Sequence, residues 1–548
     1  MNTLYYGDNL TIMREQMGKS AVDLVYLDPP FNSKSNYNII YRNLTGLPVP
    51  EQVEAFCDTW DLTPEKLEVA KNMPVLLRES GVEDYYVEFW RIWILALRNT
   101  RPELLAYLIY MVERLLQIRS VLKKTGSIYL HCDPTASHYI KIMMDGIFGH
   151  QNFLNEIIWK RTSAHSSAKR WGPVHDVLLF YAASSNYRWN RVHQAYDNQY
   201  LDTFYRNRDA DGKRFTVGDL TGAGIRHGES GQPWRGHNPT DKGRHWAIPR
   251  RVPGIDVLPK SPLAALDVLD KAGRIIWPTK DGGVPRFKRY LDDMEGVQIQ
   301  DVIDDIAPIS AHGKDRLGYP TQKPIALLDR IIRASSNKGE IVFDPFCGCG
   351  TTIYAAHAAE RQWIGCDIAI LPIKLIKREL EKRFRLVEGK HFVIDGIPVS
   401  VEQAEVLFRK DPFQFQHWFV ERVGGFPTLK RSGDTGIDGR IYFETKDGLD
   451  EMVLSVKGGN IRPTDIRDLR GVLEREPNAK MAGFLSLRPP TKAMQQEAAQ
   501  AGQYKYGNRK YDRIQFLTAE DVLVEKKLFH TPTVVGVKGE TGQVNLAV

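Results

Sequence analysis

The tetrapeptide Asp28-Pro29-Pro30-Phe31 has residue types that could activate an exocyclic amine of a nucleobase. Such an amine is a poor nucleophile because its lone pair is delocalised into the ring. The Asp28 carboxylate and the main-chain carbonyl of Pro29 could accept its hydrogens, which favours a pyramidal nitrogen that attacks an electrophilic methyl group in line. The Phe31 ring could stack on a base turned out of the duplex. The simpler alternative is a Pro-Pro turn in which Asp28 only caps the local backbone.

A second motif, FDPFCGCGTT from Phe343 to Thr352, is typical of a turn that holds a nucleoside cofactor. Gly348 and Gly350 allow the backbone to approach a ligand closely, and the N–H groups of the following helix could bind a carboxylate. Asp367, at the end of the next expected strand, could hold a ribose diol. The fingerprint GxGxxG lacks its third glycine, so a ligand without phosphate is favoured over NAD. For the glycine pair alone, an ordinary tight turn is the alternative.

The cysteines argue against two other chemistries. Cys347 and Cys349 are too close together for a CxxC zinc knuckle, and no second pair accompanies them. None of the five cysteines follows a proline, so the Pro-Cys nucleophile needed for attack at cytosine C5 is missing. Their odd number favours a reducing compartment over a disulfide framework.

The bulk properties restrict the class of protein further. A chain of 548 residues is expected to form two or three domains, and its net charge of +7 favours a polyanionic partner. The N-terminus resembles no export signal, and no apolar run reaches the roughly 18 residues that a membrane span needs, so we expect a cytoplasmic protein. No GxxxxGK[ST] sequence is present, so the chain encodes no ATP-driven translocase.

The two motifs must be positioned by strands whose carboxyl ends meet at one edge of a sheet. Apolar runs predict strands at Ala21–Leu27, Ser127–His131, Glu340–Phe343 and Gln362–Cys366. Helical patterns lie between them at residues 136–148, 325–334 and 351–360. This alternation predicts an α/β fold with a doubly wound, mostly parallel sheet.

In this order, the two motifs resemble those of the β-class amino-methyltransferases of restriction-modification systems. Four further stretches match that family: Gly7-Asp8-Asn9, Gly126–Asp133, Tyr319–Pro324 and Gly365-Cys366-Asp367. The resemblance covers about residues 1–395 and implies a Rossmann-like domain that binds S-adenosylmethionine. It implies that Asp28 to Phe31 form the catalytic loop. It also implies a cofactor pocket lined by Asp8, Thr321, Lys323, Asp344, Phe346, Gly348, Gly350 and Asp367.

The aspartate at position 28 also bears on the target base. Family members with aspartate in the tetrapeptide are usually adenine-N6 enzymes, whereas serine is commoner in cytosine-N4 enzymes. The resemblance therefore implies site-specific methylation of adenine N6 in double-stranded DNA, with cytosine N4 as the alternative. A separate restriction subunit and a homodimer are both compatible with the sequence.

Residues 159–306 differ in composition and are expected to form an inserted target-recognition region. Lysines and arginines there are interleaved with Trp171, Trp189, Trp234 and Trp246. Arginine can contact phosphates or read guanine edges, and aromatic rings can wedge beside an extruded base. Taken singly, most of these residues are surface charges or core aromatics. As a cluster they predict contact with DNA.

Residues 405–548 are expected to form a small C-terminal α/β domain. The stretches Gly433–Gly439 and Leu454–Gly458 resemble the Mrr-like branch of the PD-(D/E)xK nucleases, in which an acidic residue and an (E/Q)xK strand bind Mg²⁺. The resemblance implies that Asp438 is a metal ligand, that Lys457 polarises the nucleophile, and that Glu421 is an auxiliary group. Ser455 occupies the position of the second acidic or amide ligand. A bifunctional enzyme with an active nuclease and an inactive DNA-holding domain are therefore both open.

Overall fold

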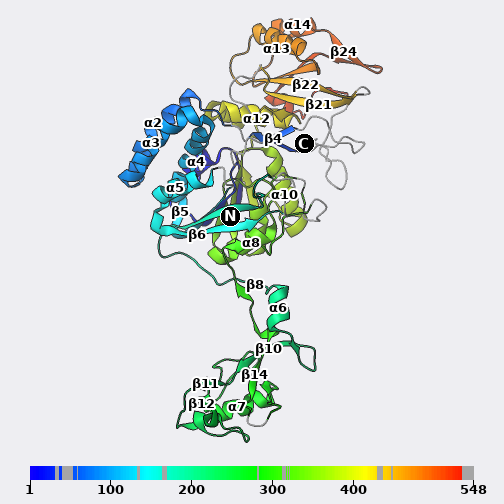
Figure 1. Cartoon of the computed structure of the whole chain (residues 1–548). Helices are drawn as coiled ribbons and strands as arrows, with labels where there is room; N and C mark the ends of the chain where they lie inside the picture. The colour runs from blue at the N-terminus through cyan, green and yellow to red at the C-terminus, as the bar shows by residue number, and fades with distance from the viewer. Residues whose placement is uncertain are drawn as a thin grey trace. The chain divides into compact units, whose positions relative to one another are not determined.

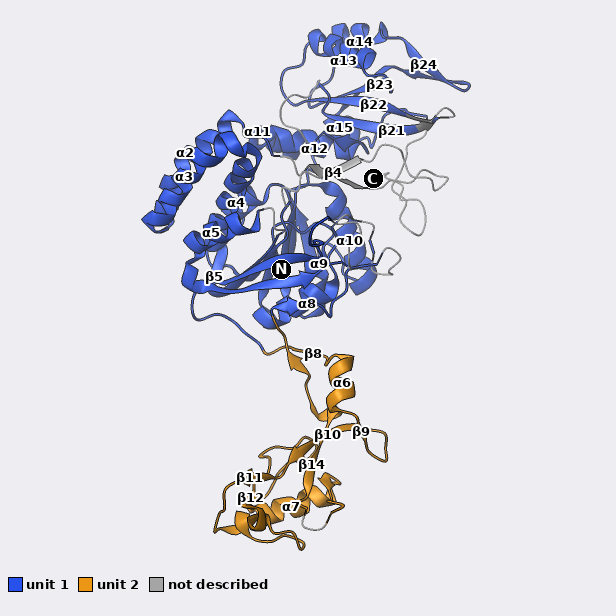
Figure 2. Ribbon diagram, in the orientation of Figure 1, with its two compact units in different colours: residues 1–190, 301–548 blue, residues 191–300 orange. Residues whose placement is uncertain are grey.

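The computed structural model describes residues 1–30, 36–39, 53–57, 60–132, 136–162, 169–280, 283–310, 316–317, 319, 321–428, 436–445 and 448–532 (Figure 1). The chain divides into two compact units (Figure 2). Residues 1–190 and 301–548 form the first unit, and residues 191–300 form the second.

The first unit is built on a nine-stranded sheet of order β16-β6-β7-β5-β2-β17-β18-β1-β19. Its strands are β16 (Val302–Ile303), β6 (Phe153–Lys160), β7 (His175–Ala182), β5 (Leu122–Cys132), β2 (Val22–Leu27), β17 (Ile341–Asp344), β18 (Gln362–Asp367), β1 (Asn2–Tyr6) and β19 (Phe392–Asp395). Neighbouring strands are parallel, except that β7 is antiparallel to β5 and β6. The predicted mostly parallel α/β fold is confirmed. A separate pair consists of β3 (Asn36–Ile39) and β4 (Val53–Cys57).

Helices cover both faces of this sheet (Figure 1). Successive side chains of a strand point to opposite faces, so Val25 and Leu27 of β2 pack on one face and Leu24 and Tyr26 on the other. The first face is covered by α1 (Asn9–Glu15), α4 (Pro102–Val121) and α5 (Ser137–Phe148), and α2 (Pro64–Glu79) and α3 (Asp84–Thr100) pack on α4 within the same apolar cluster. The second is covered by α8 (Ile325–Ser335), α9 (Thr351–Ala358) and α10 (Ile370–Phe384). No helix in the described ranges is long and apolar enough to cross a membrane.

The second unit is shorter than the insertion predicted at residues 159–306. The flanking segments form β6, β7 and β16 of the main sheet, because their apolar residues complete its core. Within the unit lie α6 (Asn198–Phe204), α7 (Pro262–Lys271) and a four-stranded sheet of order β13 (Ile275–Ile276), β14 (Arg286–Tyr290), β10 (Arg214–Asp219) and β9 (Asn207–Arg208). Two short pairs join β11 (Thr221–Ala223) to β12 (Arg244–Trp246) and β8 (His193–Gln194) to β15 (Val297–Gln298).

Two of the four tryptophans named from the sequence lie in the core of this second unit. Trp234 is 5% exposed and Trp246 is 2% exposed, and both belong to its apolar cluster. Side chains buried in this core cannot insert into DNA, so the prediction that Trp234 and Trp246 contact DNA is wrong. Trp171 and Trp189, which belong to the first unit, are 97% and 48% exposed.

The C-terminal residues form a second sheet, of order β20 (Phe426–Pro427), β21 (Gly439–Thr445), β22 (Gly448–Lys457), β23 (Ala479–Ser486) and β26 (Ile514–Thr518). The associated elements are α11 (Val401–Lys410), α12 (Pro412–Arg422), α13 (Pro463–Arg475), α14 (Lys492–Ala499), α15 (Ala519–Leu523), β24 (Gln503–Tyr506) and β25 (Arg509–Asp512). The buried apolar residues of α11 and α12 belong to the same cluster as those of α8 to α10. The C-terminal region therefore shares a core with the main sheet instead of standing apart from it.

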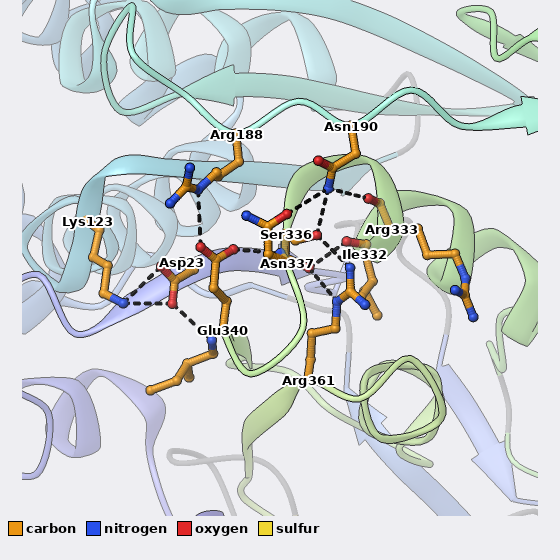
Figure 3. Close-up of polar contacts among 11 residues, drawn as sticks. Asp23, Lys123, Arg188, Asn190, Ile332, Arg333, Ser336, Asn337, Glu340 and Arg361 are labelled. Atoms are coloured by element: carbon orange, nitrogen blue, oxygen red, sulfur yellow. Dashed lines mark hydrogen bonds and ion pairs between the residues drawn. The ribbon is translucent and has the colours of Figure 1, made fainter. Parts of the chain in front are cut away.

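The loop between α8 and β17, residues 336–340, is held by polar contacts from several elements (Figure 3). Asn190 Nδ2 donates to the carbonyls of Arg333 and Ser336, each at 2.9 Å. Arg188 Nε lies 3.1 Å from Glu340 Oε1. The buried Arg361 guanidinium donates to Ser336 Oγ at 3.1 Å and to the Ser336 carbonyl at 2.6 Å. These contacts fix the start of β17 and the chain segment that leads into residues 191–300.

We expect Arg361→Ala to lower the thermal unfolding midpoint by about 2 °C. The substitution removes the donor of several buried hydrogen bonds, a loss on the order of 2 kcal/mol that is spread over the large unfolding entropy of the first unit. Lys338→Ala is the matched control, because it removes an exposed ion pair with Glu360 and should change the midpoint by less than about 1 °C. Equal shifts in calorimetric scans of the two variants would contradict this account of the loop.

Candidate active site

Three adjacent strands bring the two motifs to one edge of the main sheet. Strand β17 pairs in parallel with β2 through Val342↔Leu24 and Phe343↔Val25, and it pairs with β18 on its other side. Asp28 follows the end of β2, Asp344 ends β17 and Asp367 ends β18. The carboxyl ends of parallel strands share one edge of a sheet, which is where ligands bind in open α/β folds.

A cavity at this edge is lined by most of the predicted residues. Its wall contains these predicted members: Asp8, Asp28, Pro30, Thr321, Lys323, Asp344, Phe346, Gly348 and Asp367. Pro29 and Gly350 do not line it, and Phe31 lies outside the described residues. The structure therefore brings the tetrapeptide and the glycine turn together around one space.

Gly350 shapes the turn and does not face the ligand, which corrects its predicted place in the pocket wall. It precedes α9 in the left-handed conformation, with φ 85°, and a Cβ there would lie 2.6 Å from Cγ1 of Ile376. Gly348 has φ 47°, and a Cβ would lie 3.3 Å from the Tyr319 ring, which also lines the cavity. Both positions need glycine, and only Gly348 leaves its backbone open to a ligand.

Two aspartates, the buried Asp344 and the half-buried Asp367, accept hydrogen bonds from the turn. Asp344 accepts hydrogen bonds from Thr352 Oγ1 at 2.5 Å and from the Phe346 amide at 2.9 Å. Asp367 accepts from the amides of Gly348 and Ala369, each at 3.0 Å. Each carboxylate oxygen can accept a second hydrogen bond, so Asp367 can still receive hydroxyl groups from a ligand.

Burial raises the pKa of Asp344 to about 7 and that of Asp367 also to about 7. Desolvation is the largest cause for both, and hydrogen bonds from Thr352 and from backbone amides oppose it. The cavity therefore favours a ligand that brings hydrogen-bond donors or positive charge to these carboxylates.

Asp28 is held by Lys323 across the cavity. Lys323 Nζ lies 2.5 Å from Asp28 Oδ2 and donates to the Thr321 carbonyl at 3.3 Å. Asp28 Oδ1 is buried and has no hydrogen-bond partner among the residues that the structure describes. Lys323, predicted as a cofactor contact, thus lies in the pocket wall but pairs with the predicted catalytic carboxylate. One oxygen of Asp28 is fixed, and the other remains available to accept a hydrogen.

Asp8 acts first as a helix cap. Its Oδ1 accepts from the amides of Leu10 and Thr11 at 3.0 and 3.2 Å, and its Oδ2 lies 2.5 Å from Nη2 of Arg114. The neighbouring Asn9 donates to the Pro345 carbonyl at 2.7 Å and accepts from Arg114 Nε at 2.7 Å. This network joins α1 and α4 to the glycine turn.

Sequence reasoning missed several residues of this wall, namely Asn9, Tyr26, Tyr110 and Tyr319, and also Arg114 behind it. Asn9 and Tyr319 lie inside two of the stretches that match the resembling family, so the sequence indicated that they lie close to the site. Arg114 could also have been found, because a charged residue within the apolar run of α4 needs a buried partner. The positions of Tyr26 and Tyr110 depend on packing alone.

A buried series of hydrogen bonds leads from Tyr26, which lines the cavity, through His131 to Asp176. Tyr26 Oη lies 2.9 Å from His131 Nδ1, and His131 Nε2 lies 3.2 Å from Asp176 Oδ2. Burial lowers the pKa of His131. This series fixes the position of Tyr26, and thereby the end of β2 that carries Asp28.

In the C-terminal sheet, Asp438 precedes β21 and Lys457 ends its antiparallel partner β22, so both lie at the same end of the strand pair. Asp438 Oδ2 accepts from the Val456 amide at 2.6 Å, and Oδ1 accepts from Gln416 Nε2 at 3.2 Å. Within the described ranges, no three His, Cys, Asp or Glu side chains form a cluster that could hold a metal ion. Each oxygen of Asp438 thus accepts one hydrogen bond from the protein.

The prediction that Glu421 assists a nuclease site is wrong. Both of its carboxylate oxygens accept from the Ile370 amide at 3.1 Å, at the start of α10 in the main domain. The carboxylate is thus committed to α10 and not to the end of β21 and β22 that carries Asp438.

A doubly wound sheet with a nucleoside-type turn and an adjacent carboxylate defines a class of group-transfer enzymes. The profile of the N6_N4_Mtase family, described as DNA methylase, matches residues 22–378, and the chain belongs to this family.

Characterised relatives agree with this assignment. The chain is 34% identical over 276 residues to the type II methyltransferase M.EcaI of Enterobacter cloacae, covering 50% of this chain and 57% of the relative. It is 25% identical over 384 residues to the Mod subunit of the type III restriction-modification enzyme StyLTI of Salmonella typhimurium, covering 67% and 52%. It is also 54% identical over 63 residues to the DNA adenine methyltransferase YhdJ of Escherichia coli, covering 12% and 21%. The matches to the first two span about half the length of those proteins.

We expect Asp344→Asn to flatten the pH dependence of stability. A carboxyl whose pKa is raised on folding contributes stability at low pH, and that contribution is lost as the pH rises toward 7. Between about pH 5 and about pH 8, the variant should therefore gain roughly 2 kcal/mol relative to the unmodified protein. Thermal unfolding at both pH values measures this difference, and parallel curves would contradict the burial of an ionisable carboxyl at this position.

Proposed function

We propose that this chain transfers a methyl group from S-adenosylmethionine to N6 of adenine in double-stranded DNA. The observation that carries the proposal is the shared cavity: Asp28 after β2 and the glycine turn after β17 line one space. A nucleophile held at the first and a methyl donor held at the second would meet there without any large movement of the chain.

The residues around the turn fit the cofactor. Asp367 is placed to receive the ribose hydroxyls, Gly348 leaves room for close approach, and the start of α9 offers N–H groups to a carboxylate. When bound, the cofactor supplies an electrophilic methyl group on a sulfonium centre.

Asp28 is the proposed catalytic residue. Its Oδ1 would accept one hydrogen of the base amine, while Lys323 holds Oδ2 in place. Pro29, whose main-chain carbonyl was expected to accept the other hydrogen, does not line the cavity, so Asp28 is the acceptor that directs the nitrogen lone pair at the methyl group. Positioning of this kind needs no strong base.

The choice of adenine rests on two supports. Aspartate is the first residue of the tetrapeptide, as is usual in the adenine-N6 members of the β-class amino-methyltransferases that this chain resembles. In addition, the relative YhdJ is named as a DNA adenine methyltransferase. Cytosine N4 is the alternative, since its amine presents the same hydrogens to the same acceptors.

DNA is the proposed partner of residues 191–300 and of the exposed Trp171 and Trp189. Arginines of the second unit could contact phosphates and base edges. The similarity to a type III Mod subunit supports a separate restriction subunit as a further partner.

We expect Asp28→Ala to reduce methyl transfer by about 10²–10³-fold while the protein still binds S-adenosylmethionine, because the substitution removes an acceptor that is needed only for chemistry. Asp28→Asn retains one acceptor oxygen and should lose less. The measurement uses labelled cofactor, mixed-sequence duplex DNA and analysis of the hydrolysed nucleosides.

The nucleoside carrying the label separates the alternatives. Label in N6-methyladenine supports the proposal, and label in N4-methylcytosine would correct the base. DNA left unlabelled by the unmodified protein would refute the activity itself.

For the C-terminal domain we infer no Mg²⁺-dependent cleavage. Serine stands at position 455, where the resembling nucleases have a second acidic or amide ligand, so that ligand is missing. The opposing possibility rests on the placement of Asp438 and Lys457 at one end of β21 and β22.

We therefore expect supercoiled DNA to stay intact when the protein is incubated with Mg²⁺, and Asp438→Ala to behave like the unmodified chain. Nicking that requires Mg²⁺ and disappears in both Asp438→Ala and Lys457→Ala would instead establish a bifunctional enzyme. An electrophoretic plasmid assay distinguishes these outcomes.

A further inference from the structure

Helix α12 of the C-terminal domain contacts the segment that forms one side of the cofactor cavity. Gln414 Nε2 donates to the Ile368 carbonyl at 2.9 Å, and the Glu421 carboxylate accepts from the Ile370 amide. Ile368 and Ala369 line the cavity, together with Asp367. Thus α12 holds the chain on both sides of Ala369, immediately after the carboxylate proposed to hold the ribose.

Helix α10 lacks a cap of its own, and Glu421 supplies one. The residue at the N-cap position is Ala369, it provides no side-chain cap hydrogen bond, and the first turn of α10 contains no acidic residue. The first amides of a helix need acceptors and favour negative charge. Glu421 supplies an acceptor for these amides from another part of the chain.

The contact is also apolar and buried. Phe415, Trp418 and Phe419 of α12 are fully buried and belong to one cluster with Ile370 and Ile373 of α10. Burial raises the pKa of Glu421 to about 8, with the nearby Asp367 adding to the shift. An ionised carboxylate is costly to bury beside a second carboxyl, and a pKa of about 8 means that Glu421 accepts the Ile370 amide mostly in its neutral form at pH 7.

We propose that α12 is an integral part of the donor site, in which Glu421 and Gln414 hold residues 367–370 in the geometry that binds S-adenosylmethionine. This inference rests on the proposed function. Donor binding and docking of the C-terminal domain are then linked, and by thermodynamic reciprocity the bound donor stabilises the docked domain. In this proposal the C-terminal domain affects methylation by changing the affinity for S-adenosylmethionine and not by contacting the target base.

The test measures methylation kinetics of the full-length chain at varied S-adenosylmethionine. Glu421→Ala should raise the KM for the cofactor about tenfold, as expected for loss of a helix cap, with kcat at saturating cofactor within about twofold. Glu421→Gln retains an acceptor oxygen and should restore most of the affinity. Glu405→Ala, on the exposed surface of α11, is the matched control and should leave both constants unchanged.

A second variant and a second measurement keep the test valid if Glu421→Ala folds poorly. Gln414→Ala removes the hydrogen bond to the Ile368 carbonyl and should raise the same KM about threefold without changing affinity for DNA. In hydrogen exchange, saturating cofactor should slow the amides of α12 in the unmodified protein and do so less in Glu421→Ala.

The outcomes separate this inference from the proposed function. An unmodified chain that neither binds the cofactor nor methylates DNA overturns both. An active unmodified chain with unchanged KM in Glu421→Ala and Gln414→Ala overturns the coupling alone. A parallel loss of kcat, cofactor affinity and DNA affinity also overturns it, because that pattern reports general destabilisation.

Discussion

The parallel pairing of β2 with β17 is the constraint on which the site depends. It joins Leu24 and Val25 to Val342 and Phe343, so segments from opposite parts of the sequence end at the same edge of one sheet. Every proposed step needs this adjacency, since Asp28 and the glycine turn lie on loops that these strands position. The helices on either face, and the polar contacts that fix the loop before β17, serve to keep this pairing in register.

The cavity concentrates carboxylates from several elements, which gives it a particular electrostatic character. Asp8, Asp28, Asp344 and Asp367 all line it. Arg114 compensates Asp8 and Lys323 compensates Asp28, while the other two rely on hydroxyl and amide donors. Such an arrangement is electrostatically incomplete without a ligand, and a cofactor with a sulfonium and an ammonium group has the complementary charge.

The main sheet and most of the cavity wall could be predicted from the sequence because both depend on local patterns. Apolar runs identified the strands, and the motifs identified Asp28, Asp344, Gly348 and Asp367 at their ends. It assigned Gly350 to the ligand, since spacing alone cannot distinguish a glycine that faces a pocket from one that faces a neighbouring helix.

Long-range packing accounts for what the sequence did not indicate. In the sequence, Trp234 and Trp246 lie among basic residues just as exposed aromatic residues would, and only the fold shows that they are buried in a core. The partner of Glu421 lies about 50 residues earlier in the chain, in a helix whose missing cap carries no motif. Such contacts arise when two elements dock, so no local pattern records them.

The loop after α8 lies beside the connection that leads into residues 191–300. The outgoing connection is clamped at Arg188 and Asn190, beside the amino end of β17, whereas the cavity lies at the carboxyl ends of the strands. The returning connection enters as β16, which pairs with β6 near Trp159, and the Trp159 indole then bonds to the Ile306 carbonyl. The outgoing connection therefore meets the first unit beside the amino end of β17, and the returning connection meets it at β16, beside Trp159.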